Sequence, residues 1–291
     1  MQGIEERFPR PSVMGVVNVT PDSFSDGGVY LDADVAAAAA RRMLDEGAAI
    51  VDVGGESTRP GSDGVSLDEE LRRVVPVLER LNGEVPVSID TAKAGVARRA
   101  FELGAVMVND VTAFRADPEL AEVAAEHCAY VCLMHMQGEP RTMQLDPRYD
   151  DVASEVASFL EERLAFAVAR GVAEHRICLD PGIGFGKTVE HNVELLRRLD
   201  VLLALGRPLL IGVSRKSSLG KLAGDPAAKV GPLGASVAAA VAAYERGATI
   251  LRVHDVREHV DALAVSRALS RRLDGGSRGA DVPASQAPER V

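Results

Sequence analysis

The sequence predicts a single (β/α)₈ TIM barrel of the α/β class. Eight short apolar runs each precede a longer stretch with helical periodicity, which is the pattern of consecutive βαβ units around a parallel sheet. The 291-residue chain is 46% hydrophobic, which suits one large domain with a substantial core, although two smaller domains would also fit the length. Eight units favour a closed barrel over an open doubly wound sheet.

The candidate strands are short, apolar and bounded by turn residues. They cover residues 13–17, 50–53, 85–89, 106–108, 130–134, 177–179, 209–213 and 250–253. Residues 1–274 therefore form the predicted barrel domain. The remaining residues, 275–291, are rich in Gly, Ser, Ala and Pro without apolar periodicity, so we expect a disordered tail.

Start and stop signals support the helices between these strands. Ser66 followed by Glu69 predicts a capping box, and Asp117 before Pro118 predicts an N-cap followed by a proline in the first helical turn. Glycines stand where four helices are expected to end, because glycine adopts the left-handed conformation of a helix stop. They are Gly47, Gly104, Gly171 and Gly247.

Composition excludes several classes of partner. The formal charge of −10 argues against nucleic acid, whose phosphates require a basic excess. No apolar run is long enough to span a membrane, and residues 1–10 are too polar for a signal peptide, so we expect a cytoplasmic protein. The three cysteines, Cys128, Cys132 and Cys178, have no metal-binding or disulfide spacing and are expected to be buried free thiols.

Polar residues follow every candidate strand. In barrels of this kind the catalytic groups lie at the carboxyl ends of the strands. One such residue alone is more often a turn former or a helix cap, but eight successive cases predict a site with two chemical sectors, one for hydrogen-bond donors and one for anions. The residues that open these segments are Asn18, Gly54, Asp90, Asn109, His135, Asp180, Ser214 and Arg252.

The glycine-rich segment at residues 182–188 is not a nucleotide-binding motif. A phosphate-binding loop would require glycine where Pro181 stands, and a dinucleotide fingerprint would require glycine at Lys187. A tight loop that lets the backbone approach a flat ligand fits the glycines better.

Taken together, these segments resemble the dihydropteroate synthase family. Residues 14–28 (MGVVNVTPDSFSDGG) look like its first signature and residues 52–61 (DVGGESTRPG) like its second. Five further matches follow in family order: SIDT at 88–91, NDV at 109–111, DPGIGFG at 180–186, SRKS at 214–217 and RVHD at 252–255. The chain departs from the family at Ala235 and Ser236, where Gly-Thr or Gly-Ser is common, and in residues 112–116.

The resemblance implies condensation of 6-hydroxymethyl-7,8-dihydropterin diphosphate with p-aminobenzoate in folate biosynthesis. Asp180 would accept paired hydrogen bonds from the guanidine-like edge of the pterin, a charge-assisted and geometrically selective contact. Asp90 and Asn109 would bind the other ring heteroatoms, and Lys216 would approach the ring carbonyl. The catalytic set is Asp90, Lys216, Arg252 and His254.

The resemblance also assigns the anion and amine subsites. Asn18, Thr58, Arg252 and His254 would bind the diphosphate. Asn18 would also be a ligand of Mg²⁺, which usually takes few protein ligands when it binds phosphates. The p-aminobenzoate residues would be Arg59, Pro60, Phe185, Lys216 and Ser217. The loops at residues 20–28 and 57–64 are expected to close once diphosphate is bound, and the family implies a homodimer that sulfonamides target.

Two other functions remain open at this stage. A methyltetrahydrofolate-dependent methyltransferase-like barrel shares the Asp and Asn set but does not need Arg252, His254 or the SRKS run. A non-catalytic pterin-binding paralogue would be expected to have lost Asn18, Asp90 or Lys216, all of which this chain keeps. Structural roles also compete: Asp90 as a helix cap, Phe185 as core packing and Lys216 as a solvated surface lysine.

Overall fold

The computed structural model describes residues 2–20, 33–59 and 61–270. The predicted tail at 275–291, Pro60 and most of the loop at 20–28 lie outside these residues. Within them, no helix is both long and apolar enough to cross a lipid bilayer.

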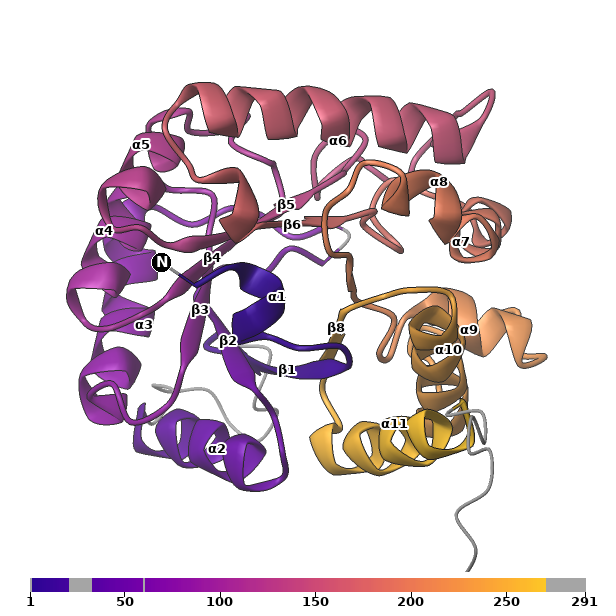
Figure 1. Ribbon diagram of the computed structural model, residues 1–291, viewed down its shortest axis with the longest axis horizontal. Coiled ribbons are helices and arrows are strands. Elements are labelled where there is room, and N and C mark those ends of the chain that lie inside the picture. The colour runs from indigo at the N-terminus through magenta and orange to yellow at the C-terminus, as the bar shows by residue number, and fades with distance from the viewer. Residues whose placement is uncertain (1, 21–32, 60, 271–291) are drawn as a thin grey trace, which may run out of the picture.

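Eight parallel strands form the predicted barrel, with the helices around it (Figure 1). The strands are β1 Ser12–Asn18, β2 Ile50–Gly54, β3 Val87–Asp90, β4 Met107–Asp110, β5 Tyr130–Met134, β6 Ile177–Asp180, β7 Leu210–Ile211 and β8 Ile250–Val253. Their order is β6-β5-β4-β3-β2-β1-β8-β7, and a parallel bridge between Leu179 and Leu209 joins the two ends. The TIM-barrel prediction is confirmed.

Two strands are shorter than predicted. The third begins at Val87 rather than at residue 85, since Pro86 has no N–H to donate to the ladder. The seventh contains only Leu210 and Ile211, because the chain leaves the sheet at once and Lys216 N donates to Val213 O in a turn.

The helices follow the predicted units. They are α1 Ile4–Arg7, α2 Ala33–Asp45, α3 Leu67–Leu81, α4 Ala94–Glu102, α5 Glu119–Glu126, α6 Val152–Ala169, α7 Val189–Arg197, α8 Leu199–Leu203, α9 Ser217–Leu222, α10 Leu233–Glu245 and α11 Val256–Ser270, with a 3-10 turn at Glu174–Arg176. Each predicted glycine stop lies two residues beyond a helix and has a positive φ.

The predicted caps hold in part, since α5 begins at Glu119 with Pro118, not Asp117, as its N-cap. Ser66 accepts from Glu69 N, but the Glu69 carboxylate pairs with Arg72 and Arg73 instead of completing a capping box. Asp117 accepts from Glu119 N at the start of α5. Its other oxygen accepts from Ala94 N at the start of α4, so one carboxylate serves two helix starts.

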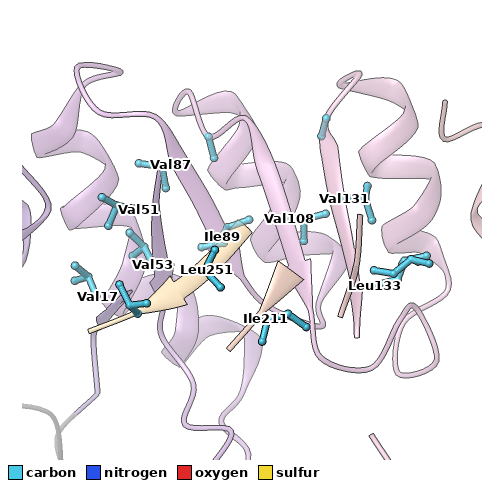
Figure 2. Packing of buried hydrophobic residues seen from close by; sticks show 14 of the residues in the cluster. Val17, Val51, Val53, Val87, Ile89, Val108, Val131, Leu133, Ile211 and Leu251 are labelled. Atoms are coloured by element: carbon cyan, nitrogen blue, oxygen red, sulfur yellow. The ribbon is translucent and has the colours of Figure 1, made fainter. Parts of the chain in front are cut away.

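Two apolar layers enclose the barrel wall. Outward-facing residues such as Val51, Ile89 and Leu133 pack under the helices (Figure 2). Inside, a smaller cluster fills the lower barrel: Met14, Ile50, Met107, Tyr130, Cys132, Cys178, Leu210 and Ile250. Ile4 and Phe8, from α1 and the residue after it, pack against this cluster and close the amino-terminal end of the barrel (Figure 1).

The cysteine prediction was wrong at one position. All three cysteines are free, and Cys132 and Cys178 are buried neighbours on β5 and β6. Cys128 is exposed because it lies in the turn after α5 with a φ of 50°.

Candidate active site

A polar layer lies above the apolar floor of the barrel. Arg252 of β8 donates from Nε to Asp52 of β2 at 2.7 Å and from Nη2 to Asp90 of β3 at 2.8 Å. Asn109 of β4 donates to the same Asp52 oxygen at 2.9 Å. Four strands thus converge on one hydrogen-bonded cluster, which brings together three residues that the sequence predicted separately.

Asp52 is the member of this cluster that the sequence assignment missed. Its side chain is fully buried, and its second oxygen, Oδ1, has no hydrogen-bond partner within the described residues. The available signal was a carboxylate inside the apolar run 50–53. Because side chains alternate along a strand, Asp52 points into the barrel while Val51 and Val53 face the helices.

The cluster holds two carboxylates against one guanidinium. Burial and the neighbouring Asp52 raise the pKa of Asp90 despite the opposing effect of Arg252. Burial alone would lower the pKa of Arg252, but Asp52 and Asp90 raise it, so Arg252 stays charged. A rigid, paired cation of this kind is preorganised toward a bound anion.

Asp180 ends β6 on the opposite side of the barrel mouth. Its Oδ1 accepts from Gly182 N at 2.7 Å, which fixes the carboxylate against the following loop. Burial raises its pKa to about 6. The group is therefore largely ionised at pH 7 and can accept hydrogen bonds from a flat donor edge.

The glycines after Asp180 allow close packing of backbone on backbone. A side chain at Gly182 would come within 1.9 Å of His135 O. Lys187, which is buried, ties the same two loops together, with Nζ 2.8 Å from His135 Nδ1 and 3.0 Å from Phe185 O. His135, a strand-end residue in the sequence, is thus committed to structure rather than to an open site, and burial lowers its pKa to about 2.

Lys216 lies over the ring of Phe185, with Nζ 4.2 Å from the ring centroid. This contact joins the loop after β7 to the loop after β6 and excludes the role of a solvated surface lysine. Burial and Arg252 lower the pKa of Lys216 to about 8, so the ammonium is mostly charged at pH 7. Lys216 can therefore face either a carbonyl oxygen or an anion.

His254 follows β8 and contacts Ser214, which follows β7. His254 N donates to Ser214 Oγ at 3.2 Å, and His254 Nδ1 lies 3.2 Å from the same oxygen. Since that oxygen already accepts one bond, its hydroxyl can donate to Nδ1 and leave Nε2 as the protonated nitrogen. Burial and Arg252 lower the pKa of His254 to about 3, so it can offer an N–H but no positive charge.

A cavity of about 760 Å³ opens above β2 to β5. Of the predicted site residues, Asp90 and Thr58 line it, together with Val111, Met136 and Arg115. Phe114 does not reach it, because its side chain is fully buried in the core. In residues 112–116 it is therefore Thr112, Arg115 and Ala116 that face the cavity.

The remaining predicted residues surround this mouth. Asn18 ends β1 beside Gly54, and Ser217 begins α9; both are half-buried. Arg59 is exposed in the loop after β2, where Gly61 N donates to Pro140 O. Among the residues that the structure describes, no three His, Cys, Asp or Glu side chains are grouped to hold a metal ion.

Comparison with known proteins agrees with this geometry. A family model described as pterin binding enzyme matches residues 14–254. Dihydropteroate synthase of Neisseria meningitidis serogroup C is 50% identical over 268 residues, which cover 91% of this chain and 94% of that protein.

Solved structures give the same result. Xanthomonas albilineans dihydropteroate synthase with 4-aminobenzoic acid has a TM-score of 0.83 and 48% identity, covering 91% of this chain and 94% of that one. The same organism's enzyme in complex with 7,8-dihydropteroate has a TM-score of 0.80 and 46% identity, covering 91% and 95%. This chain therefore belongs to the pterin-binding enzymes and, among them, to the dihydropteroate synthase family.

Proposed function

We propose that this enzyme joins 6-hydroxymethyl-7,8-dihydropterin diphosphate to p-aminobenzoate, giving 7,8-dihydropteroate and diphosphate. The observation that carries the proposal is the pairing, in one barrel mouth, of a buried acceptor, Asp180, with a half-buried and fixed cation, Arg252. A pterin diphosphate needs both, an acceptor for its ring and a cation for its leaving group. The two Xanthomonas albilineans structures support this proposal, because one contains 4-aminobenzoic acid, the amine substrate, and the other contains 7,8-dihydropteroate, the product.

The pterin would lie between β3, β4 and β6. Asp180 keeps one oxygen on Gly182 N and offers the other to the N–H edge of the ring. Asn109 has an amide oxygen, Oδ1, that is buried and without a partner among the described residues, so a ring N–H would satisfy it. The Asp90 carboxyl lies beside it in register across β3 and β4.

The diphosphate would lie between β1, β8 and the loop after β2. Arg252 supplies positive charge, while His254 and Thr58 supply neutral hydrogen-bond donors. Negative charge on the leaving oxygen grows as the C–O bond breaks, so donors fixed near it lower the barrier. No protein nucleophile is needed, because the amine attacks the stabilised pterin cation once diphosphate has left, and the new bond is followed by loss of a proton from the amine to water.

Mg²⁺ is part of the proposal, with Asn18 as its protein ligand. A single half-buried amide oxygen at the end of β1 fits this ion, which keeps several waters and binds phosphates through few protein groups. When bound, the ion neutralises charge on the leaving diphosphate. Asn18 would orient it toward the anion sector.

The p-aminobenzoate would lie above the pterin, against Phe185 and Lys216. Their stacked arrangement gives one apolar wall and one charge. Ser217 would donate to the carboxylate of the amine substrate. Arg59 and Pro60 are proposed as the outer wall. The proposal also includes a cytoplasmic homodimer, which the family resemblance supports. Sedimentation of the purified protein would test the dimer.

One assay tests the function: formation of dihydropteroate from both substrates, with and without Mg²⁺ and a sulfonamide. We expect turnover that requires Mg²⁺ and is inhibited by the sulfonamide in competition with p-aminobenzoate. The control is Asp90→Asn, which should bind a Mg²⁺–diphosphate complex but turn over poorly. Pterin binding without turnover would favour the non-catalytic paralogue, and methyl transfer from a reduced folate to a corrinoid would favour the methyltransferase.

A further inference from the structure

The seam between β7 and β8 has only a short stretch of strand pairing. These strands pair only through Leu210 with Ile250 and Ile211 with Leu251. Lys216 lies five residues beyond Ile211. The backbone ladder therefore cannot fix Lys216 relative to the anion-binding residues on β8.

Side chains span the seam where the ladder ends. Arg215 donates from Nε to Asp255 Oδ2 at 3.0 Å and from Nη2 to Asp255 Oδ1 at 2.5 Å, a bidentate contact between the residue before Lys216 and the residue after His254. On the inner side, Ser214 contacts His254 through Oγ. Both proposed substrate-binding residues are thus flanked by cross-seam contacts.

The backbone at Arg215 is also held in an uncommon conformation. Its φ is 59°, in the left-handed region that residues other than glycine rarely adopt. Ser236 Oγ accepts from Arg215 N at 2.9 Å, and Gly231 N donates to Arg215 O at 3.1 Å. Ser236 is the second residue of the Ala235-Ser236 pair, which stands where Gly-Thr or Gly-Ser is common in the family, and its hydroxyl fixes the turn that aims Lys216.

We infer that Arg215 and Asp255 are positioning residues, a clamp that sets Lys216 against Arg252 and His254. The inference rests on the proposed function for the roles of those three groups. Arg215 touches no substrate in this account. It acts through the direction of the next residue, because the left-handed turn at 215 determines where Lys216 leaves the backbone.

The clamp should matter far more for turnover than for folding. The Arg215 side chain is 49% exposed and that of Asp255 is 20% exposed, and exposed ion pairs contribute little to stability. Displacing a catalytic group by about 1 Å can cost on the order of 100-fold in rate. A large kinetic loss without a matching loss of thermal stability is therefore the signature of the clamp.

The test uses Arg215→Asn, Asp255→Asn and the double variant. Asparagine tolerates the left-handed conformation at 215, so the substitution removes the guanidinium and keeps the backbone. Asparagine also suits position 255, directly before α11, because it is a favoured residue at the start of a helix. The control pair is Arg98→Gln and Glu126→Gln, which breaks an exposed ion pair between α4 and α5.

We expect each clamp variant to lower kcat by about 10-fold to 100-fold. The kcat is calculated from the concentration of sites that still bind diphosphate in the presence of Mg²⁺, so that misfolded protein is not counted. The kcat of the double variant should be no lower than that of the less active single variant, because either substitution alone already breaks the contact between Arg215 and Asp255. The control variants should stay within about twofold of the wild type, since their ion pair joins two helices outside the barrel mouth.

The sign of the two single effects separates a clamp from a simple charge effect. If only charge near the diphosphate mattered, removing Arg215 would slow turnover and removing Asp255 would raise it. Opposite signs, or losses below threefold in both single variants, would overturn the inference.

Hydrogen exchange separates this inference from the proposed function. Both substitutions should speed hydrogen exchange at the backbone amides of residue 215 and Gly231, even in the absence of substrates. A wild-type chain without turnover would contradict the proposed function alone. Unchanged exchange in both variants would contradict the clamp alone.

Discussion

Asp180→Asn should make the empty protein more stable while it destroys pterin binding. Burial raises the pKa of Asp180 from 3.8 to about 6. The folded state therefore holds this proton more tightly than the unfolded state, so the cost of ionising the carboxyl grows between pH 3.8 and about pH 6 and is complete above it. At 1.36 kcal/mol per pKa unit, the penalty at pH 7.5 is about 3 kcal/mol.

The substitution removes this penalty without breaking the local loop. Asparagine Oδ1 can still accept from Gly182 N, as Asp180 Oδ1 does at 2.7 Å. For the ligand, however, the NH₂ group of the substituted side chain would face the N–H groups of the pterin edge, so two hydrogen-bond donors would oppose each other. The charged hydrogen bond lost at the second oxygen costs about 1.5–3 kcal/mol, and the donor that now faces a donor adds to this loss, so pterin affinity should fall by roughly 100-fold or more.

Thermal unfolding and calorimetry measure the two effects in the same samples. At pH 7.5 the variant should unfold on the order of 6 °C higher than the wild type. At pH 5 the wild-type carboxyl is mostly protonated, so the stability difference should shrink to about half. A variant that is less stable at pH 7.5, a difference that does not shrink at pH 5, or unchanged pterin affinity would refute the reasoning.

Three further results are expected. Arg252→Ala and His254→Ala should each lower kcat more than they weaken p-aminobenzoate binding, and non-additively; normal turnover with only a raised p-aminobenzoate KM would move them out of the anion site. The KM for the pterin substrate should rise about tenfold between pH 7 and pH 5, because the Asp180 acceptor is lost as pH falls through its pKa of about 6. Calorimetry should find p-aminobenzoate binding poorly to the enzyme alone and well after diphosphate and Mg²⁺, and equal affinities would exclude ordered binding.

The residues at strand ends were the predictable part of the site. Asp90, Asp180 and Arg252 each stand in or next to the end of an apolar run, and barrel architecture alone places such residues at one rim. The structure puts all three in the mouth. Their partners were not predictable in the same way, because a hydrogen bond between β2 and β8 depends on a register set by contacts 200 residues apart.

Asp52 and Lys187 show why the rest was missed. Asp52 lies inside a strand rather than after it, so a search at strand ends passes over it. Lys187 lies in a glycine-rich loop, where a lysine suggests a solvent-exposed or phosphate-binding group, yet it is buried against His135 and Phe185. The role of Asp52 depends on side chains from β4 and β8, and that of Lys187 on the packing of two loops; the periodicity of the sequence encodes neither.

Ile4 and Phe8 close the amino-terminal end of the barrel, so the site opens only at the carboxyl ends of the strands. Because these residues and the sulfur-rich cluster above them close the amino-terminal end, a pterin that binds first, as proposed, would lie deepest and could leave only through the mouth. Any molecule bound against Phe185 and Lys216 would then block the exit of the pterin. Occupants of the upper subsite should therefore prolong the residence of the pterin below, so that the last ligand to enter sets the release time of both.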